Sequence, residues 1–123
     1  MTIDTNIIIA YLAGDPEVKE NLSNWRLRGL PLLLSTVVET EVLSFPKFSP
    51  EELQSTLKFL EENFLSIPLS REIARIAAEL RRNYRLKFPD AAIAATAIYT
   101  NTPLVTRNLR DFKKVPDLKL LKI

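Results

Sequence analysis

The sequence predicts an α/β protein, a three-layer α/β/α sandwich in which helices cover a central, mainly parallel sheet. Short apolar segments that suit strands alternate with longer segments that suit helices, and this alternation is typical of parallel sheets. The run Leu32–Ser35 is apolar up to its last residue, as expected of a strand covered on both faces. Within Phe88–Thr100, the stretch Ala91–Tyr99 is apolar except at Thr96, which indicates a helix buried inside the domain.

Recognisable start and stop signals bound these elements. The clearest is Ser49-Pro50-Glu51-Glu52, which combines a capping serine, a proline at the first helical position and a glutamate at the third. Gly14 and Gly29 end two further helices. The expected helices cover residues 7–13, 15–28, 36–44, 49–63, 71–84 and 88–100. The expected strands cover residues 2–4, 32–35, 64–67, 104–106 and 118–121.

Length and composition limit the class of protein. A chain of 123 residues suffices for one domain with its own hydrophobic core, and no repeat or linker divides it, so we expect a single domain over residues 1–123. The net charge of +2 gives a mildly basic surface that is compatible with a polyanionic partner. The sequence contains no membrane-spanning apolar run and no signal-peptide pattern, so we expect a cytoplasmic protein with no membrane association.

The chain contains neither histidine nor cysteine. Their absence excludes a Ser-His-Asp triad, a thiol nucleophile, RNA cleavage by paired histidines and the usual zinc sites. Catalysis by this chain must therefore rest on carboxylates, amides, hydroxyls, lysine or arginine. A site built from carboxylates generally binds a hard cation such as Mg²⁺ or Mn²⁺.

Acidic and amide side chains fall where strands of the predicted sheet end. Asp4 ends the first strand, and Asp90 begins the buried helix. Asn108 and Asp111 follow the strand that ends at Thr106. Ligands of open parallel sheets bind beyond the carboxyl ends of the strands, so these side chains can meet at one rim. Taken singly, these residues have simpler explanations, since Asp4 suits an Asx turn, Asp90 a helix cap, and the Asn108–Asp111 segment a surface turn. The number of converging acids nevertheless favours a metal site.

Glu41 lies in the helix that follows the second strand. At about 100° per residue, one side of this helix carries Val37, Val38, Val42 and Phe45. Glu41 lies among them, whereas Glu39 points nearly the opposite way and is expected to be solvated. A carboxylate on an apolar face is costly unless it is paired or bound to a cation, which predicts a function for Glu41. The alternative is a half-exposed helix from which Glu41 simply reaches solvent.

Four blocks of the sequence together resemble a PIN domain, most closely the VapC-type toxins of prokaryotic toxin–antitoxin pairs. In chain order, the blocks are Ile3-Asp4-Thr5-Asn6, Ser35 to Glu41, Pro89 to Ala97 (PDAAIAATA) and Leu104 to Phe112 (LVTRNLRDF). The resemblance spans nearly the whole chain. It implies the PIN-like version of the three-layer sandwich predicted above.

The resemblance also implies the site residues. Catalytic and metal-binding carboxylates are expected at Asp4, Glu41 and Asp90, and the fourth acidic position matches either Asn108 or Asp111. If the amide of Asn108 fills that position, the site loses one charge and depends on Asp111. Polar side chains that support the site by hydrogen bonding are expected at Asn6 and Thr106, and at Asn108 where it is not a ligand.

The activity implied by the resemblance is that of a ribonuclease that depends on Mg²⁺ or Mn²⁺. An RNA substrate, an antitoxin partner and frequent dimerisation are implied with it. From the excess of apolar residues in Ile7–Leu12 and Leu53–Leu60, we expect a homodimer and a groove for an antitoxin helix.

Cationic residues lie on both sides of the proposed site in the sequence and are candidates for RNA phosphate contacts. The alternative for each is a solvated position with an ordinary charge pair. The candidates are Arg81, Arg82, Arg85, Lys87, Arg107 and Arg110.

Other functions fit the sequence less well. A phosphatase of the haloacid-dehalogenase type needs a second aspartate two residues after Asp4, where this chain has Asn6. A receiver-like domain needs an acidic pair before its central aspartate, and none is present. The non-enzymatic alternative is a catalytically degenerate PIN domain that binds RNA or protein, which the number of retained acids disfavours.

Overall fold

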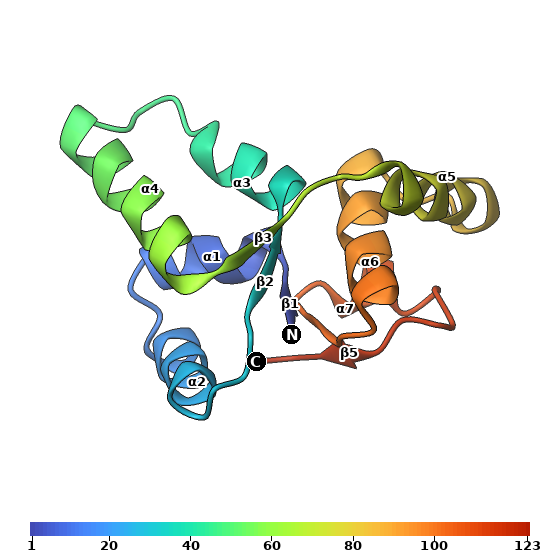
Figure 1. Cartoon of the computed structure of the whole chain (residues 1–123), viewed down its shortest axis with the longest axis horizontal. Coiled ribbons are helices and arrows are strands. Elements are labelled where there is room, and N and C mark those ends of the chain that lie inside the picture. Colours follow the sequence, from blue (N-terminus) through green and yellow to red (C-terminus); the bar gives the residue numbers. More distant parts are fainter.

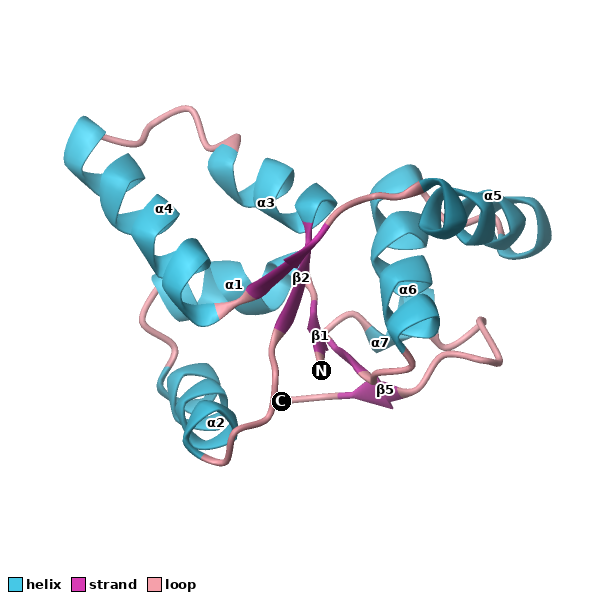
Figure 2. Cartoon of the chain, in the orientation of Figure 1, coloured by secondary structure: helices cyan, strands magenta, loops and turns pink.

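Five short strands form one parallel sheet in the order β3-β2-β1-β4-β5. The structure is a computed structural model, and it describes residues 1–123. Helices cover both sides of the sheet, with α1, α2 and α4 on one side and α5, α6 and α7 on the other (Figures 1 and 2). The predicted three-layer arrangement is therefore confirmed. The strands are β1 (Thr2–Ile3), β2 (Leu33–Ser35), β3 (Leu65–Ile67), β4 (Leu104–Val105) and β5 (Leu120–Leu121).

Most helices begin where the sequence signals predicted. Ser49 and Glu52 form the reciprocal capping box of α4, and the Asp15 carboxylate accepts hydrogen bonds from two backbone amides at the start of α2. Helix α1 begins at Thr5, earlier than predicted, because the Asp4 carboxylate caps it. The helices are α1 (Thr5–Leu12), α2 (Pro16–Leu27), α3 (Thr36–Leu43), α4 (Pro50–Asn63), α5 (Arg71–Tyr84), α6 (Phe88–Thr100) and α7 (Leu109–Phe112).

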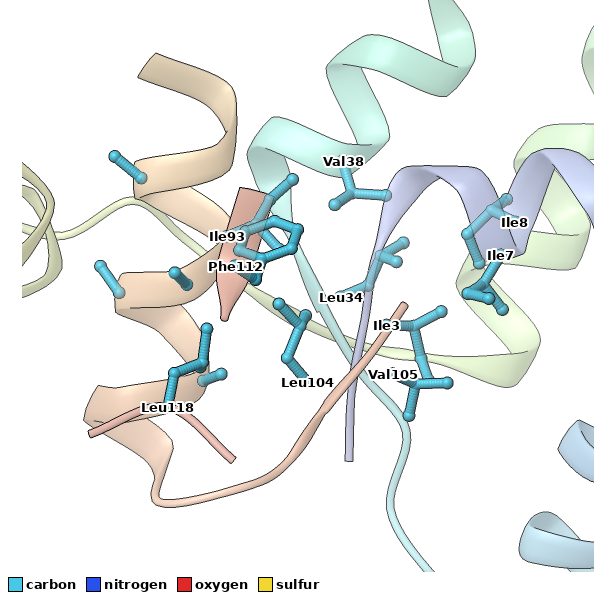
Figure 3. Close-up of a cluster of buried hydrophobic side chains, with 14 of the residues drawn as sticks. Ile3, Ile7, Ile8, Leu34, Val38, Ile93, Leu104, Val105, Phe112 and Leu118 are labelled. Carbon is cyan, nitrogen blue, oxygen red and sulfur yellow. The ribbon is translucent and has the colours of Figure 1, made fainter. Parts of the chain in front are cut away.

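The core lies on both faces of the central strands. Ile3, Leu34 and Val105 are fully buried, and they contribute to the apolar cluster shown in Figure 3. Helix α6 is buried from Ala91 to Ala97 and packs closely along α5, as its alanine-rich sequence predicted. Helix α7 was not predicted. It has four residues, and only the last of them, Phe112, is fully buried. None of the seven helices combines the length and apolar character needed to cross a membrane.

The topology brings distant parts of the chain to one rim. Strands β2, β1 and β4 are neighbours and run in the same direction, so their carboxyl ends lie at the same edge of the sheet. Helices α1 and α3 start directly after β1 and β2, respectively, and α6 packs against both α3 and β1. Residues at the ends of these strands and the starts of these helices therefore share one region.

Candidate functional site

Asp4 is fixed in place between β1 and β4. Its backbone N–H donates to the Val105 carbonyl (3.0 Å), which places it directly beyond the last ladder position of the two strands. Its carboxylate accepts from the Thr5 backbone N–H through Oδ1 (2.8 Å) and from the Thr106 hydroxyl through Oδ2 (2.7 Å). Only 4% of the residue is exposed. Its position and both carboxylate oxygens are therefore determined by the fold.

Burial raises the pKa of the Asp4 carboxyl above its ordinary value. The hydrogen bonds from Thr106 and Thr5 oppose this rise, whereas the negative charges of Asp90 and Glu41 add to it. Three acids that belong to different elements therefore lie close enough to repel one another. Such repulsion is relieved when a cation binds between them.

Asp90 lies in the first turn of α6, one residue after Pro89. Its carboxylate makes no capping hydrogen bond, so the simple explanation of Asp90 as a helix cap is wrong. Burial raises its pKa, and the charges of Asp111 and Glu41 raise it further, while Lys87 and Lys114 lower it. The half-buried carboxylate is thus free of protein hydrogen bonds and lies within reach of two acids and two lysines.

Glu41 does not lie on a buried apolar face, as the sequence predicted. Val38 and Val42 are buried as expected and Val37 is half-buried, but Glu41 is exposed and Phe45 is 53% exposed. Helix α3 ends at Leu43, so Phe45 lies beyond it and does not cover the apolar side as predicted, and Glu41 reaches solvent. Glu39, expected to be solvated, is half-buried.

Glu41 nevertheless lies at the candidate site. The Thr5 hydroxyl donates to its carboxylate (2.6 Å), and its charge raises the pKa of both Asp4 and Asp90. Thr5 was not among the predicted site residues. The signal that pointed to it was its position between Asp4 and Asn6, at the first turn of a helix that starts at the rim.

The segment after β4 is organised by the Thr106 hydroxyl. While it donates to Asp4, this fully buried group also accepts from the Asn108 backbone N–H (2.9 Å) and from Asn6 Nδ2 (3.4 Å). Asn6 Oδ1 accepts in turn from the Arg107 backbone N–H (3.3 Å). Asn6 and Thr106 therefore lie where hydrogen bonds can hold the acidic residues in position.

Asn108 and Asp111, the two alternatives for the fourth acidic position, contact each other. Asn108 Nδ2 donates to Asp111 Oδ2 (2.8 Å), and the Asp111 charge raises the pKa of Asp90. The charge at this corner of the site is thus that of Asp111, and the Asn108 amide orients it.

The donor set fits a hard divalent cation by its chemistry, because it offers carboxylate oxygens that already repel one another. No three of the acids lie close enough to form a ready-made metal cage. Mg²⁺ commonly keeps several waters and binds proteins through only one or two carboxylates, so this spacing is compatible with it. The four acids that the fold gathers are Asp4, Glu41, Asp90 and Asp111.

Arg107 is held by partners within the protein. Its guanidinium forms an ion pair with Asp15 (2.8 Å), lies 4.0 Å from the Glu17 carboxylate, and donates from Nε to the Ile123 carbonyl (2.8 Å). It therefore ties the segment after β4 to the start of α2. The remaining cationic candidates are exposed and form no ion pair; they are Arg81, Arg82, Arg85, Lys87 and Arg110.

An apolar hollow of about 430 Å³ opens beside Glu41, between α1, α3 and the segment that follows α3. Ile9 and Phe45, which line it, are 55% and 53% exposed. The predicted apolar residues of Leu53–Leu60 do not line it, and Phe59 and Leu60 pack in or against the core instead. The complete lining is Ile9, Leu12, Ala13, Glu41, Val42, Ser44, Phe45 and Phe48.

Comparison with known proteins identifies similar chains over the full length of this one. The PIN domain profile matches residues 1–118. Ribonuclease VapC19 of Mycobacterium tuberculosis is 33% identical, covering 95% of each chain, and Ribonuclease VapC of Rickettsia bellii is 29% identical, covering 100% of this chain and 96% of that protein.

Solved structures agree with this result. A toxin–antitoxin complex from Klebsiella pneumoniae contains a chain of 35% identity that superimposes with a TM-score of 0.82, covering 99% of this chain and 98% of that one. VapBC2 from Rickettsia felis, bound to a DNA fragment from its promoter, gives a TM-score of 0.85 at 27% identity, with 99% and 97% coverage.

Proposed function

Because the chain belongs to the PIN-domain family, we propose that it is an endoribonuclease that depends on Mg²⁺ or Mn²⁺ and acts as the toxin of a VapBC-type toxin–antitoxin pair. The similarity to proteins named Ribonuclease VapC and to toxin–antitoxin complexes supports this function. We further propose that residues 1–123 form one PIN domain and that the protein acts in the cytoplasm, where it meets RNA and its antitoxin.

The observation that carries the proposal is the mutual repulsion of acids at one rim. The charges of Asp90 and Glu41 raise the pKa of Asp4, and those of Asp111 and Glu41 raise the pKa of Asp90. A structural role would not require four carboxylates to gather at this cost. A divalent cation bound there would supply positive charge at the scissile phosphate and acidify an attacking water.

The residues of the chain would divide the remaining work. Asp4 and Asp90 would hold the cation, because Asp4 is rigidly fixed and the Asp90 carboxylate has no competing hydrogen bond. Glu41 and Asp111 each accept a hydrogen bond from a neighbouring side chain and would orient water through their carboxylates. Asn6, Thr106 and Asn108 would hold these acids in position.

Cations beside the acids would bind the substrate. Lys87 and Lys114 act on Asp90 from close range, since each lowers its pKa. Sequence reasoning missed Lys114, because it lies after the short α7 in a segment read as a polar turn. Arg110, on the exposed side of α7, is a further candidate for phosphate contact.

The antitoxin would occupy the apolar hollow beside Glu41. An amphipathic helix with apolar anchors would fill the space between Ile9 and Phe45, and its next residues would reach the acidic rim. The neighbouring toxin–antitoxin complexes support an antitoxin partner. We also propose a homodimer, and a sedimentation run that shows only monomer at high protein concentration would overturn this part.

A second candidate function is a degenerate PIN domain that binds RNA or protein without cleaving it. The observation that favours it is that no three acids form a preassembled cage.

One assay separates the two functions. Labelled RNA is incubated with the protein in Mg²⁺, Mn²⁺ or EDTA, alongside Asp4→Asn and Asp90→Asn. We expect the wild type to cleave RNA in Mg²⁺ or Mn²⁺ but not in EDTA. Either variant should cleave about a hundredfold more slowly. Metal-independent cleavage, or full activity in a variant, would refute the mechanism.

A further inference from the structure

We infer that the end of α5 carries a second phosphate site, which binds the RNA backbone away from the bond that is cleaved. This inference rests on the proposed ribonuclease function and adds to it a separate place where substrate is held. The site is an open hollow of about 520 Å³ lined by Ala78, Arg81, Arg82, Arg85 and Leu86.

Helical spacing gathers the three arginines around a small residue. Arg81 and Arg82 lie three and four positions after Ala78, and Arg85 follows one turn later, so all border the same side of the helix. The methyl group of Ala78 leaves space between them, and Leu86 is buried beneath. The hollow therefore has a short apolar floor and cationic walls.

The guanidinium groups of the hollow are unpaired. Glu79 lies three positions before Arg82, which is a spacing that permits an ion pair, but none forms. The dipole of α5 places only about half a negative charge at its carboxyl end, which is much less than three positive charges. The alternative of ordinary charge pairs on a solvated helix does not describe these arginines. Concentrated, unbalanced positive charge of this kind attracts a polyanion.

Arg85 adds an independent observation. It ends α5 in the left-handed conformation (φ 55°, ψ 36°), and its N–H donates to the Arg81 carbonyl (3.1 Å). Glycine and asparagine are the usual residues in this conformation, because a longer side chain strains it. The chain thus has an arginine where the backbone alone favours glycine, and this residue lines the hollow.

The hollow is connected to the acidic rim through Lys87. Two residues after Arg85, Lys87 is the N-terminal cap of α6, and its charge acts on Asp90. The arginines of the hollow are not among the charges that shift the pKa of Asp90, and none of the four acids lines the hollow. An RNA strand cleaved at the rim could therefore continue past Lys87 and place a later phosphate among the arginines. Guanidinium groups suit this task because they bind phosphate oxygens in pairs.

Binding to RNA in EDTA tests the inference without relying on cleavage. Fluorescence anisotropy is measured with fluorescein-labelled single-stranded RNAs of about twenty and about four nucleotides, over a series of KCl concentrations. For the Arg82→Gln/Arg85→Gln variant, we expect about tenfold weaker binding of the long RNA and a salt slope smaller by about 1.4, since each phosphate contact contributes about 0.7. Binding of the short RNA, which does not reach the hollow, should change less than about twofold.

A matched control removes the same charge elsewhere. Arg28 and Arg71 are exposed and unpaired, and Arg28→Gln/Arg71→Gln should bind both RNAs as the wild type does. Arg85→Gly relieves the left-handed strain, so it should melt no lower than the wild type and still bind the long RNA more weakly. Wild-type binding by Arg82→Gln/Arg85→Gln, or an equal loss in the control, would overturn the inference.

The outcomes separate this inference from the proposed function. If the wild type cleaves RNA in metal but the variants of the hollow bind normally, the second site fails alone. If the wild type does not cleave RNA but the variants of the hollow lose affinity as expected, the ribonuclease proposal fails and the hollow stands as a site for RNA phosphates.

Discussion

The Thr106 hydroxyl donates a 2.7 Å hydrogen bond to Asp4 Oδ2, joining two buried residues separated by 102 positions in the chain. The bond is possible because β1 and β4 are adjacent and parallel, so both residues leave the sheet at the same edge. It provides one of the two contacts that stabilise the Asp4 carboxylate in its charged form. The pKa of Asp4 therefore depends on a neutral hydroxyl at the end of a different strand.

Thr106→Val should make Asp4 harder to ionise. The hydroxyl counters the rise in pKa that burial causes, so without it the already raised pKa of Asp4 rises further. We expect the acidic limb of the pH–activity profile to move to higher pH, and stability to fall by about 1.5–3 kcal/mol, the value of a hydrogen bond to a charged group. Thr106→Ser retains the hydroxyl and should keep the wild-type profile. An acidic limb that does not move in the valine variant would contradict this role.

Asp90→Asn should raise the melting temperature of the metal-free protein by a few degrees at neutral pH. The pKa of Asp90 is raised in the folded protein, so the folded state holds the proton more tightly than the unfolded chain does. Ionisation of Asp90 therefore destabilises the fold as pH rises through its folded pKa, and the penalty is absent below the ordinary carboxyl pKa.

The expected signature is a difference between variant and wild type that grows from acidic to neutral pH in EDTA. Mg²⁺ should raise the melting temperature of the wild type more than that of Asp90→Asn, because the cation relieves the repulsion only where the carboxylate is present. A difference that is constant across pH would show that ionisation of Asp90 is not its cause.

Arg107→Gln should lower kcat rather than raise KM. The Arg107 guanidinium binds Asp15 and the Ile123 carbonyl, while the backbone N–H of the same residue donates to Asn6. Loss of the guanidinium should therefore loosen the segment that carries Thr106. We expect about a tenfold loss in kcat and in metal affinity, as for other residues that orient metal ligands. Arg110→Gln, which removes an exposed and unpaired cation, should instead raise KM. The reverse pattern would make Arg107 a substrate contact.

Ile9→Glu and Phe45→Ser should each weaken binding of the proposed antitoxin. Both residues are more than half exposed, so their replacement should leave the melting temperature nearly unchanged while it breaks the apolar lining of the hollow. Leu27→Ser is the matched control, because Leu27 is 86% exposed and lies outside the hollow. Calorimetric titration that gives equal affinities for Phe45→Ser and Leu27→Ser would exclude the hollow as the docking site.

Sequence reasoning succeeded where local chemistry decides structure. The capping box at Ser49 and the apolar run of α6 fixed those helices to their correct residues, because caps and hydrophobic periodicity act over a few positions. The gathering of Asp4, Asp90 and Asp111 followed from the rule for the ends of parallel strands.

Other features depend on contacts that no local pattern contains. Periodicity placed Glu41 among apolar residues but could not reveal that α3 ends at Leu43 and leaves Glu41 exposed. The ion pair between Arg107 and Asp15 joins residues 92 positions apart, so the sequence alone made Arg107 look like a free cation. Helix α7 has four residues, too few for a periodic signal.

Titration of Mn²⁺ into the wild type, Asp4→Asn, Asp90→Asn and the double variant, followed by electron paramagnetic resonance, tests the central claim most directly. If Asp4 and Asp90 hold one ion together, each single variant should lose most of the affinity, and the double variant should lose little more. Wild-type affinity in either single variant, or losses in the double variant that equal the two single losses combined, would show that these carboxylates do not share a cation.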